Sequence, residues 1–331
     1  MAHKMKAAFF RKTGNPEVIE WGEVEIPEVK EDGILVKTKA VALEHVDTYF
    51  RSGKYPLPKG SPHPFIVGHD LVGTIEKVGK NVHHFKPGQR VWSVSLGTNG
   101  LQGSFSEYVS APATYFFPVP DNVEDLEMIS VAQSGITACY GLIRTGILNA
   151  KEIIFVNGGG GGVGSAVIQL SKIRGARIIA ATNGQEKMDW CKSCGAELVL
   201  DYKKNDIEKK VRSVFPSGVD LFWDTSRHPH FDLSVPLLAA KGRIVLMAGA
   251  GSQPPFPVGP FYQKECTMRG FSILNVDPEE LRGYAEIVNR CVAEKHLKYK
   301  IAASLPLAET AKAHALIEDK ADLWGKIILK P

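Results

Sequence analysis

The chain has 331 residues, of which 44% are hydrophobic, so it can bury a large interior, and two domains are the default expectation for its length. Its net charge of +4 comes from basic residues interspersed with acidic ones, which argues against a nucleic-acid-binding stripe. No apolar run approaches the roughly 20 residues of a membrane span, and the N-terminus lacks the apolar core of a signal peptide, so we expect a cytoplasmic protein with neither a membrane nor a nucleic acid as partner.

The first part of the chain, to about residue 120, consists of short β-prone segments cut by Gly and Pro. This pattern predicts an irregular, barrel-like β domain. The predicted strands are 6–10, 18–21, 33–42, 71–78, 90–95 and 105–112.

After residue 150 the pattern changes, because strand-like apolar runs alternate with helical stretches. This alternation predicts a parallel sheet covered by helices on both faces. The strands expected here are 151–157, 177–182, 196–201, 219–224, 243–249 and 268–276.

The C-terminal part begins at Asp277-Pro278, a typical helix start. We expect helices near 278–294 and 307–319 and a last strand at 326–330, all returning to the first domain. The chain is therefore divided into a domain of residues 1–123 and 276–331 and a domain of residues 124–275.

Five consecutive glycines, 158–162, follow the apolar run 153–156 and precede a helical stretch, which indicates a strand, a tight turn and a helix start. The pattern G-x-G-x-x-G fits Gly159, Gly161 and Gly164. The first glycine allows the turn, the second lets phosphate oxygens approach the main chain, and the third lets the helix pack on the strand. Helix N-terminal N–H groups bind phosphate. The run thus predicts a dinucleotide site, and its cofactor-binding residues are Gly159, Gly160, Gly161, Gly162, Val163 and Gly164.

The five cysteines of this long chain do not indicate a disulfide framework. Cys191 and Cys194 form a C-x-x-C pair, but Trp190 beside them suggests a helix. No second pair or nearby histidine completes a zinc quartet, so we interpret both as reduced structural thiols.

The order of these domains resembles the medium-chain dehydrogenase/reductase superfamily, and four segments are similar to its quinone oxidoreductase (zeta-crystallin-like) branch. The segments are 47–56 (D-T-Y-F-R-S-G-K-Y-P), 86–91 (K-P-G-Q-R-V), 161–164 (G-G-V-G) and 325–329 (G-K-I-I-L). The resemblance implies an α/β fold, with a doubly wound Rossmann sheet and an irregular GroES-like β-barrel catalytic domain. It also implies a homodimer paired through the edge strand 269–275.

No acidic residue stands at the end of the second strand of the predicted βαβ unit. In NAD-binding folds an Asp or Glu there binds the ribose 2′-hydroxyl, and such a carboxylate would repel a 2′-phosphate. Asn183, Lys187 and Tyr202 instead offer hydrogen bonds or positive charge, and Lys187 and Tyr202 fall where the resembling family contacts the 2′-phosphate. We predict NADPH as the cofactor; the nearby Glu186 keeps NADH as the alternative.

Zinc enzymes of the superfamily bind catalytic metal through two cysteines and the histidine of a G-H-E motif. This chain keeps Gly68-His69-Asp70 but has Glu44 and Gln133 at the cysteine positions. We therefore expect no metal. The alternative is a mixed-ligand zinc site of Glu44, His69 and Asp70, which would make the protein an alcohol or polyol dehydrogenase.

Without zinc to acidify an alcohol, reduction of an electron-poor acceptor is favoured over dehydrogenation. The resemblance implies NADPH-dependent hydride transfer from nicotinamide C4 to a quinone or an α,β-unsaturated carbonyl. Tyr55 lies where this branch has a cleft tyrosine and is the first candidate to donate a proton to the developing enolate. The predicted catalytic residues are Tyr55, Tyr49, Asp47 and Glu44.

Three further assignments complete the predictions. Gly249 and Lys326 are assigned to the cofactor site, and Arg51 either neutralises cofactor phosphates or caps its own segment. A last alternative is a non-enzymatic, crystallin-like protein that binds NADPH and turns over no acceptor.

Overall fold

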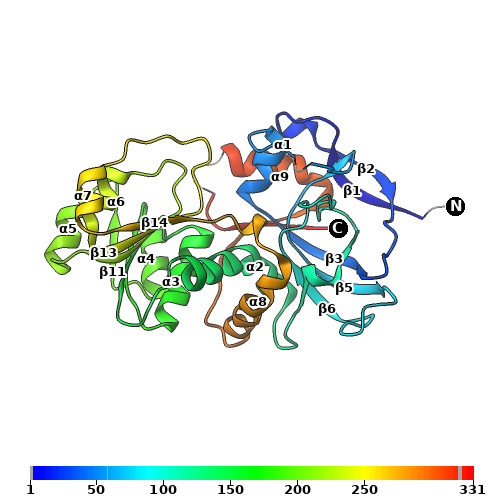
Figure 1. The fold of residues 1–331 in the computed structure, drawn as a ribbon. Helices are drawn as coiled ribbons and strands as arrows, with labels where there is room; N and C mark the ends of the chain where they lie inside the picture. The colour runs from blue at the N-terminus through cyan, green and yellow to red at the C-terminus, as the bar shows by residue number, and fades with distance from the viewer. Residues whose placement is uncertain (1–2, 58, 320–322) are drawn as a thin grey trace. The chain divides into compact units, whose positions relative to one another are not determined.

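The computed structural model describes residues 3–57, 59–319 and 323–331, and it divides into two compact units (Figure 1). Unit 1 comprises Met1–Gln133 and Val276–Pro331, and unit 2 comprises Ser134–Asn275. Each unit has its own buried apolar cluster. The division into functional domains at 123/124 and 275/276 stays a prediction.

Unit 1 is built mainly from antiparallel strands, as its short β-prone segments predict. The strands are β1 (Lys4–Phe10), β2 (Glu20–Glu25), β3 (Gly33–Leu43), β4 (Phe65–Ile66), β5 (Leu71–Val78), β6 (Arg90–Ser93), β7 (Tyr108–Pro112), β8 (Phe116–Pro118), β15 (Ile301–Pro306) and β16 (Lys326–Lys330). The larger sheet has the order β15-β16-β3-β5-β6-β8, with β7 also paired to β3, and the smaller one has the order β2-β1-β4.

The helices of unit 1 are α1 (His45–Ser52), α8 (Pro278–Ala293) and α9 (Thr310–Asp319), with single 3-10 turns η1 (Pro16–Val18), η2 (Ala113–Tyr115) and η5 (Leu307–Glu309). Helix α2 (Asp125–Tyr140) crosses the boundary between the units. The C-terminal strand β16 pairs with β3, which places Lys326 in the same sheet as the strand that leads into α1.

Unit 2 contains a six-stranded parallel sheet in the order β11-β10-β9-β12-β13-β14, the doubly wound Rossmann order. Its strands are β9 (Ile153–Asn157), β10 (Arg177–Thr182), β11 (Leu198–Asp201), β12 (Val219–Asp224), β13 (Leu238–Leu246) and β14 (Thr267–Gly270). Its helical elements are α3 (Gly162–Ile173), α4 (Gln185–Cys194), α5 (Ile207–Val214), α6 (Phe231–Leu237), α7 (Val258–Gln263), the π-helical turn η3 (Gly141–Thr145) and the 3-10 turn η4 (Ile273–Asn275).

Both faces of this sheet are buried. On one face, Phe155 and Phe222 stack with ring centroids 4.8 Å apart and pack with residues of α5 and α6. Helices α3 and α4 contact β9 and β10, and Ile154 and Val156 of β9 are also fully buried. A strand buried on both sides needs a continuous apolar run, which explains the sequence of 153–156.

The structure corrects several predicted strands. The segment 18–21 is split between η1 and β2, and 105–112 is a strand only from Tyr108. The predicted strand 268–276 ends at Gly270, because β13, with which it pairs, ends at Leu246. The segment 269–275, predicted as the edge strand of a dimer, is therefore a strand only as far as residue 270.

One helical stretch of the described residues, Asp125–Thr145, is long and apolar enough to cross a membrane. However, 78% of its most apolar window is buried inside the protein, as in the core helix of a folded domain.

Candidate active site

The glycine run forms the turn between β9 and α3 in unit 2. The motif assigned the tight turn to Gly159. In the structure the left-handed residue of the turn is Gly158, which has a φ of +81°. The N–H groups of Gly158 and Gly159 both donate to the carbonyl of Ala181 at 3.0 Å. The turn is thereby tied to the end of β10.

The remaining glycines have different steric surroundings. A Cβ on Gly164 would lie 2.2 Å from the carbonyl oxygen of Gly158, so helix α3 can pack on the turn only with glycine there. A Cβ on Gly161 would meet only that same oxygen, at 3.4 Å, so the space beyond Gly161 is open.

The N-terminus of α3 provides the donors for an anion. The first main-chain bond into the helix is donated by Ser165 to Gly161, so the N–H groups of Gly162, Val163 and Gly164 precede the helical ladder. Such groups bind phosphate oxygens. The open space at Gly161 and these donors fit a dinucleotide pyrophosphate.

The residues predicted for the 2′-phosphate gather at the carboxyl ends of β10 and β11. Asn183 follows β10, and Tyr202, 48% exposed, follows β11 and donates its N–H to the carbonyl of Thr182. The Lys187 side chain, on the first turn of α4, passes within 2.9 Å of the position that a Cβ on Gly160 would take. These three side chains therefore lie around one strand edge, next to the glycine turn.

The acid at the end of β11 is bonded to the turn that follows it. Asp201 is buried and accepts a hydrogen bond from the N–H of Lys203 at 2.9 Å, which holds the following turn. Gly249, after β13, has a φ of +91°, which an L side chain adopts only with strain.

Sequence reasoning missed Asn157 and Asp224, which end β9 and β12. The Asn157 amide donates to Asp224 Oδ1 at 3.0 Å, and the N–H of Ser226 donates to the same oxygen at 2.8 Å. Both residues follow apolar runs, and the carboxyl ends of parallel strands carry ligand sites. The position of both residues at the ends of predicted parallel strands could therefore have marked them as candidates for the cofactor site.

In unit 1, the predicted catalytic residues lie on and around α1. Glu44 precedes the helix, and its N–H donates to Asp47 Oδ2 at 2.7 Å in a capping box. The other Asp47 oxygen contacts His69 Nδ1, and both side chains are 1% exposed or less. Asp47 therefore holds α1 and His69 together.

Glu44 forms a partly buried ion pair with Lys326; the Lys326 side chain is 6% exposed and the Glu44 side chain 17%. Burial raises the pKa of Glu44, and the charge of Lys326 opposes that rise. The assignment of Lys326 to the cofactor stays a prediction; in unit 1 its ammonium group is paired with Glu44.

Asp70 lies fully buried beside this pair. Its Oδ1 accepts the N–H of Ala42 at 2.9 Å. Burial and the neighbouring Glu44 carboxylate raise the pKa of Asp70 well above its usual range, which favours the neutral acid.

These side chains do not form a metal-binding arrangement. Among residues 3–57, 59–319 and 323–331, no three His, Cys, Asp or Glu side chains are placed to hold a metal ion. One reason is that the Glu44 carboxylate already has a cationic partner in the ammonium group of Lys326. The donor set Glu44, His69 and Asp70 therefore does not fit zinc.

Tyr55 and Tyr49 are brought together at the end of α1. Their ring centroids are 5.2 Å apart in an edge-to-face contact, and the N–H of Tyr55 donates to the carbonyl of Tyr49 at 3.1 Å. Partial burial and then the neighbouring Tyr49 raise the pKa of Tyr55 above 10, so its phenol is protonated at neutral pH. Phe50 contacts both Tyr55 and His69: its ring meets the Tyr55 ring edge-on at 5.8 Å and lies tilted against the His69 ring at 5.0 Å between centroids.

Arg51 is a structural residue. Its side chain is 2% exposed, Nη1 donates to the carbonyl of Gly14 at 2.6 Å, and Nη2 pairs with Glu318. Both partners lie outside its own segment, so the guanidinium group joins α1 to Gly14 and to α9 and does not cap α1.

Two family models match the chain, an alcohol dehydrogenase GroES-like domain over residues 30–121 and a zinc-binding dehydrogenase over residues 162–290. Quinone oxidoreductase of Sus scrofa is 28% identical over 98% of this chain and 97% of its own length. The NADPH-dependent alkenal/one oxidoreductase of Arabidopsis thaliana is 34% identical over 76% of this chain and 65% of its own length.

Among solved structures, the Escherichia coli quinone oxidoreductase complexed with NADPH is similar, with a TM-score of 0.87 and 25% identity over 99% of this chain and 100% of the other. The chain therefore belongs to the medium-chain dehydrogenase/reductase superfamily. Within it, the relatives place the chain in the zinc-independent quinone oxidoreductase branch, as the segments around Tyr55 and Gly161 predicted.

Proposed function

We propose that the protein is an NADPH-dependent reductase that transfers hydride to a quinone or an α,β-unsaturated carbonyl without a metal ion. The quinone and alkenal/one oxidoreductases to which the chain is similar support this reaction and this cofactor. The observation that carries the proposal for the site is the Tyr55 hydroxyl, which has no hydrogen-bond partner among the described residues and stands beside the Tyr49 ring.

Bound NADPH supplies a hydride from C4 of its nicotinamide. Conjugate addition of hydride leaves negative charge on the oxygen of an enone, and a quinone becomes a quinol anion. The Tyr55 hydroxyl donates its proton, or a hydrogen bond, to that oxygen. The Tyr49 ring forms a flat wall beside it, suited to a planar acceptor.

Asp47 and Glu44 act as positioning residues in this proposal. Both Asp47 oxygens are already used, one for the N-cap of α1 and one for His69, and Glu44 is paired with Lys326. They hold α1, which carries Tyr49 and leads into the turn that carries Tyr55.

The cofactor is bound by unit 2 residues. Gly161, Gly162 and Val163 receive the pyrophosphate at the N-terminus of α3, and Lys187, with Asn183 and Tyr202, receives the 2′-phosphate. Support comes from the open space at Gly161, from the Lys187 side chain beside Gly160, and from Tyr202 at the carboxyl end of β11.

The proposal is tested by following NADPH and NADH oxidation against quinones, enones, aldehydes and alcohols, with metal content measured on the same sample. Rapid oxidation of NADPH by quinones or enones, unchanged by a chelator, is expected. Turnover confined to alcohols and lost with the chelator contradicts it. Tight NADPH binding with no turnover of any acceptor supports the crystallin-like alternative.

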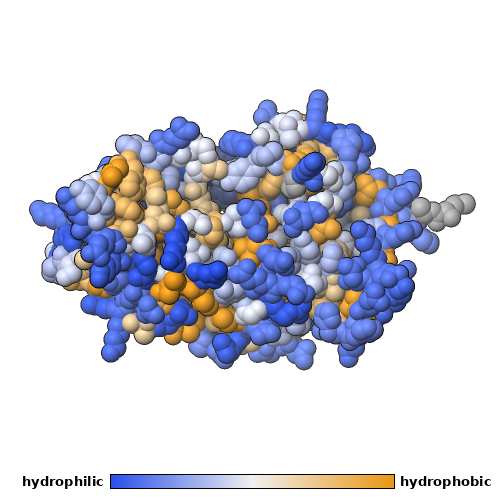
Figure 2. Space-filling model, in the orientation of Figure 1, coloured by the Kyte–Doolittle hydropathy of each residue, from blue (hydrophilic) through white to orange (hydrophobic). Residues whose placement is uncertain are grey.

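A homodimer through β14 belongs to the same proposal. All four residues of this outer strand are exposed, Met268 to 41%. Figure 2 shows apolar residues at the surface where Figure 1 has α6 and α7, and on α7 Val258 and Tyr262 are 63% and 66% exposed. An unpaired strand edge beside exposed apolar side chains favours pairing with a second copy. Sedimentation at the mass of a monomer would contradict the dimer.

A cytoplasmic location is also proposed. It is supported by the five cysteines, which are all buried free thiols, as a reducing compartment keeps them.

A further inference from the structure

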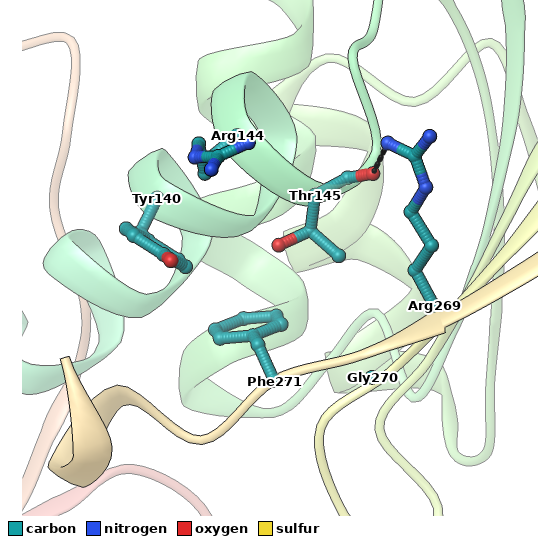
Figure 3. A pocket seen from close by; sticks show the side chains of 6 residues that line it. All are labelled: Tyr140, Arg144, Thr145, Arg269, Gly270 and Phe271. Carbon is teal, nitrogen blue, oxygen red and sulfur yellow. Dashed lines mark hydrogen bonds between the residues drawn. The ribbon is translucent and has the colours of Figure 1, made fainter.

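A pocket on unit 2 lies between the π-helical turn η3 and the end of β14, where Arg269 Nη1 donates to the carbonyl of Thr145 at 3.3 Å (Figure 3). In the proposed homodimer a second copy covers this edge of the sheet. The interior of unit 1 holds a polar group that the proposed reaction does not use, the imidazole of His69.

The imidazole of His69 is buried at a cost in stability. Its side chain is 1% exposed, and Nε2 is buried without a hydrogen-bond partner among the residues that the structure describes. A buried polar atom without a partner destabilises the folded state, and an apolar side chain of similar size would avoid this cost. Stability alone therefore does not explain why a histidine occupies position 69.

The histidine is held at both its ring and its main chain. Asp47 Oδ1 contacts Nδ1, and the other Asp47 oxygen accepts the N–H of Glu44 at 2.7 Å in the cap of α1. The N–H of Leu96 donates to the carbonyl of His69 at 2.9 Å. The imidazole cannot turn without losing its contact with Asp47, so its ring has a fixed place beside the start of α1.

The fixed ring leads to the proposed proton donor through one phenylalanine. The centroid of the His69 ring lies 5.0 Å from that of Phe50, at an interplanar angle of 35°, and the Phe50 ring meets the Tyr55 ring edge-on at 5.8 Å. Phe50 is 7% exposed, whereas Tyr55 is only half-buried. We infer that His69 is a positioning residue, which fixes the Tyr55 ring through Phe50; the inference rests on the proposed role of Tyr55 as the donor.

His69 acts only through these neighbours, because its buried Nε2 does not reach an acceptor. A general acid is effective only within hydrogen-bond reach of the oxygen that it protonates. A loosely held Tyr55 ring therefore lowers the rate of the chemical step and leaves the binding of NADPH unchanged.

The inference is tested with His69→Asn. The amide nitrogen of asparagine can take the place of Nδ1 and keep the contact with Asp47, whereas the part of the ring that packs on Phe50 is lost. The variant should lower kcat for an enone at least about fivefold and keep the Kd for NADPH, measured by fluorescence titration, within about twofold of the wild type. Phe50→Leu, which removes the ring between His69 and Tyr55, should have the same effect and carries the same test if His69→Asn does not fold.

Combination with Tyr55→Phe separates positioning from general support of the fold. In that background His69→Asn should cause no further loss of kcat, because the hydroxyl that His69 positions is absent. Additive losses in the double variant, or a wild-type kcat in Phe50→Leu or in folded His69→Asn, would overturn the inference while Tyr55→Phe still supports the proposed donor. A wild-type kcat in Tyr55→Phe would contradict the donor itself, and the inference with it.

His84→Asn is the matched control. The exposed His84 ring also lies against a phenylalanine, Phe85, at 4.6 Å between centroids, but no ring contact joins it to Tyr55 among the described residues. It should keep the kcat and the NADPH affinity of the wild type. A loss of kcat as large as that in His69→Asn would show that the substitution acts through the fold of unit 1, and would overturn the inference.

Discussion

Tyr55 is the residue on which the proposed proton transfer depends. Its hydroxyl has no hydrogen-bond partner among the described residues, and its raised pKa keeps the phenol protonated at neutral pH. Phenylalanine preserves the ring contacts with Tyr49 and Phe50 and removes only the donor.

Tyr55→Phe should lower kcat for an enone at least about tenfold, in line with the usual contribution of a general acid. The KM for NADPH should not change, because Tyr55 is not assigned to the cofactor. Tyr108→Phe, a half-buried tyrosine of β7, is the control. In the wild type, the rate should fall only above pH 10, since the donor is lost when the phenol ionises and its pKa is raised. An unchanged kcat in Tyr55→Phe would remove this residue as the donor.

Lys187 is expected to distinguish the two nicotinamide cofactors. Lys187→Ala should lower kcat/KM for NADPH at least about tenfold and leave NADH use nearly unchanged, because only NADPH has the 2′-phosphate. Lys192→Ala on the same helix, where the lysine pairs with Asp189, is the control. Equal losses with both cofactors would show that Lys187 supports the fold of α4 instead.

His314 on α9 should make the protein sensitive to acid. It is fully buried, neither ring nitrogen has a hydrogen-bond partner among the described residues, and burial lowers its pKa from 6.5 to about 4. The unfolded chain then binds a proton more readily than the folded one below pH 6.5. The free energy of unfolding is therefore highest above pH 6.5. It falls as the pH drops from 6.5 towards 4, by at most about 3 kcal/mol from this residue.

Urea unfolding of wild type and His314→Gln at several pH values measures this effect. The variant should lose less stability than the wild type between pH 6.5 and 4. His296→Gln, at an exposed position, should follow the wild type. Parallel pH profiles for all three proteins would show that His314 does not drive the acid sensitivity.

The turn between β9 and α3 makes a prediction for a whole element, because two of its glycines have opposite surroundings. A Cβ on Gly164 would collide with the Gly158 main chain at 2.2 Å. A Cβ on Gly161 would come no closer than 3.4 Å to any atom outside its chain neighbours and would not collide. Gly164→Ala should therefore lower the free energy of unfolding by about 2 kcal/mol, as overpacking does.

Gly161→Ala should leave the free energy of unfolding nearly unchanged but weaken NADPH binding at least about tenfold, because its methyl group takes the space meant for the pyrophosphate. Chemical denaturation and fluorescence titration with NADPH measure the two effects separately. If Gly161→Ala binds NADPH normally, the pyrophosphate does not lie at this turn.

Elements with strong local signals were predicted well from the sequence. The run 153–156 and the glycines after it define the strand, turn and helix, because a strand buried on both faces must be apolar and the close packing at Gly164 excludes any Cβ. The prediction failed at 268–276, where the end of β14 depends on its neighbour β13 and not on its own apolar residues. The register between two strands is a tertiary property that local patterns do not contain.

The sequence identified which residues form the candidate site, but not which of them contact one another. The sequence pointed to Glu44, Asp47, His69 and Asp70, yet the pairing of Glu44 with Lys326 joins residues from opposite ends of the chain. It arises only when β16 pairs with β3. For the same reason the sequence left a zinc site open, whereas in the structure Lys326 is the cationic partner of Glu44, and no three donor side chains of the described residues are placed to hold a metal ion.

At the scale of the whole molecule, the Rossmann order of unit 2 and the β-sheets of unit 1 agree with the superfamily to which the chain belongs. The fold is shared by zinc dehydrogenases and zinc-independent reductases, so it does not decide the reaction. The two chemistries deliver hydride to different carbon atoms of the same enone.

The central claim is tested most directly by the position of the transferred hydride. NADPH carrying deuterium at C4 of the nicotinamide is incubated with the protein and an α,β-unsaturated ketone, and the product is analysed by NMR. We predict a saturated ketone with deuterium on the β-carbon and a solvent-derived proton on the α-carbon. An allylic alcohol with deuterium on the former carbonyl carbon would contradict the proposed reaction.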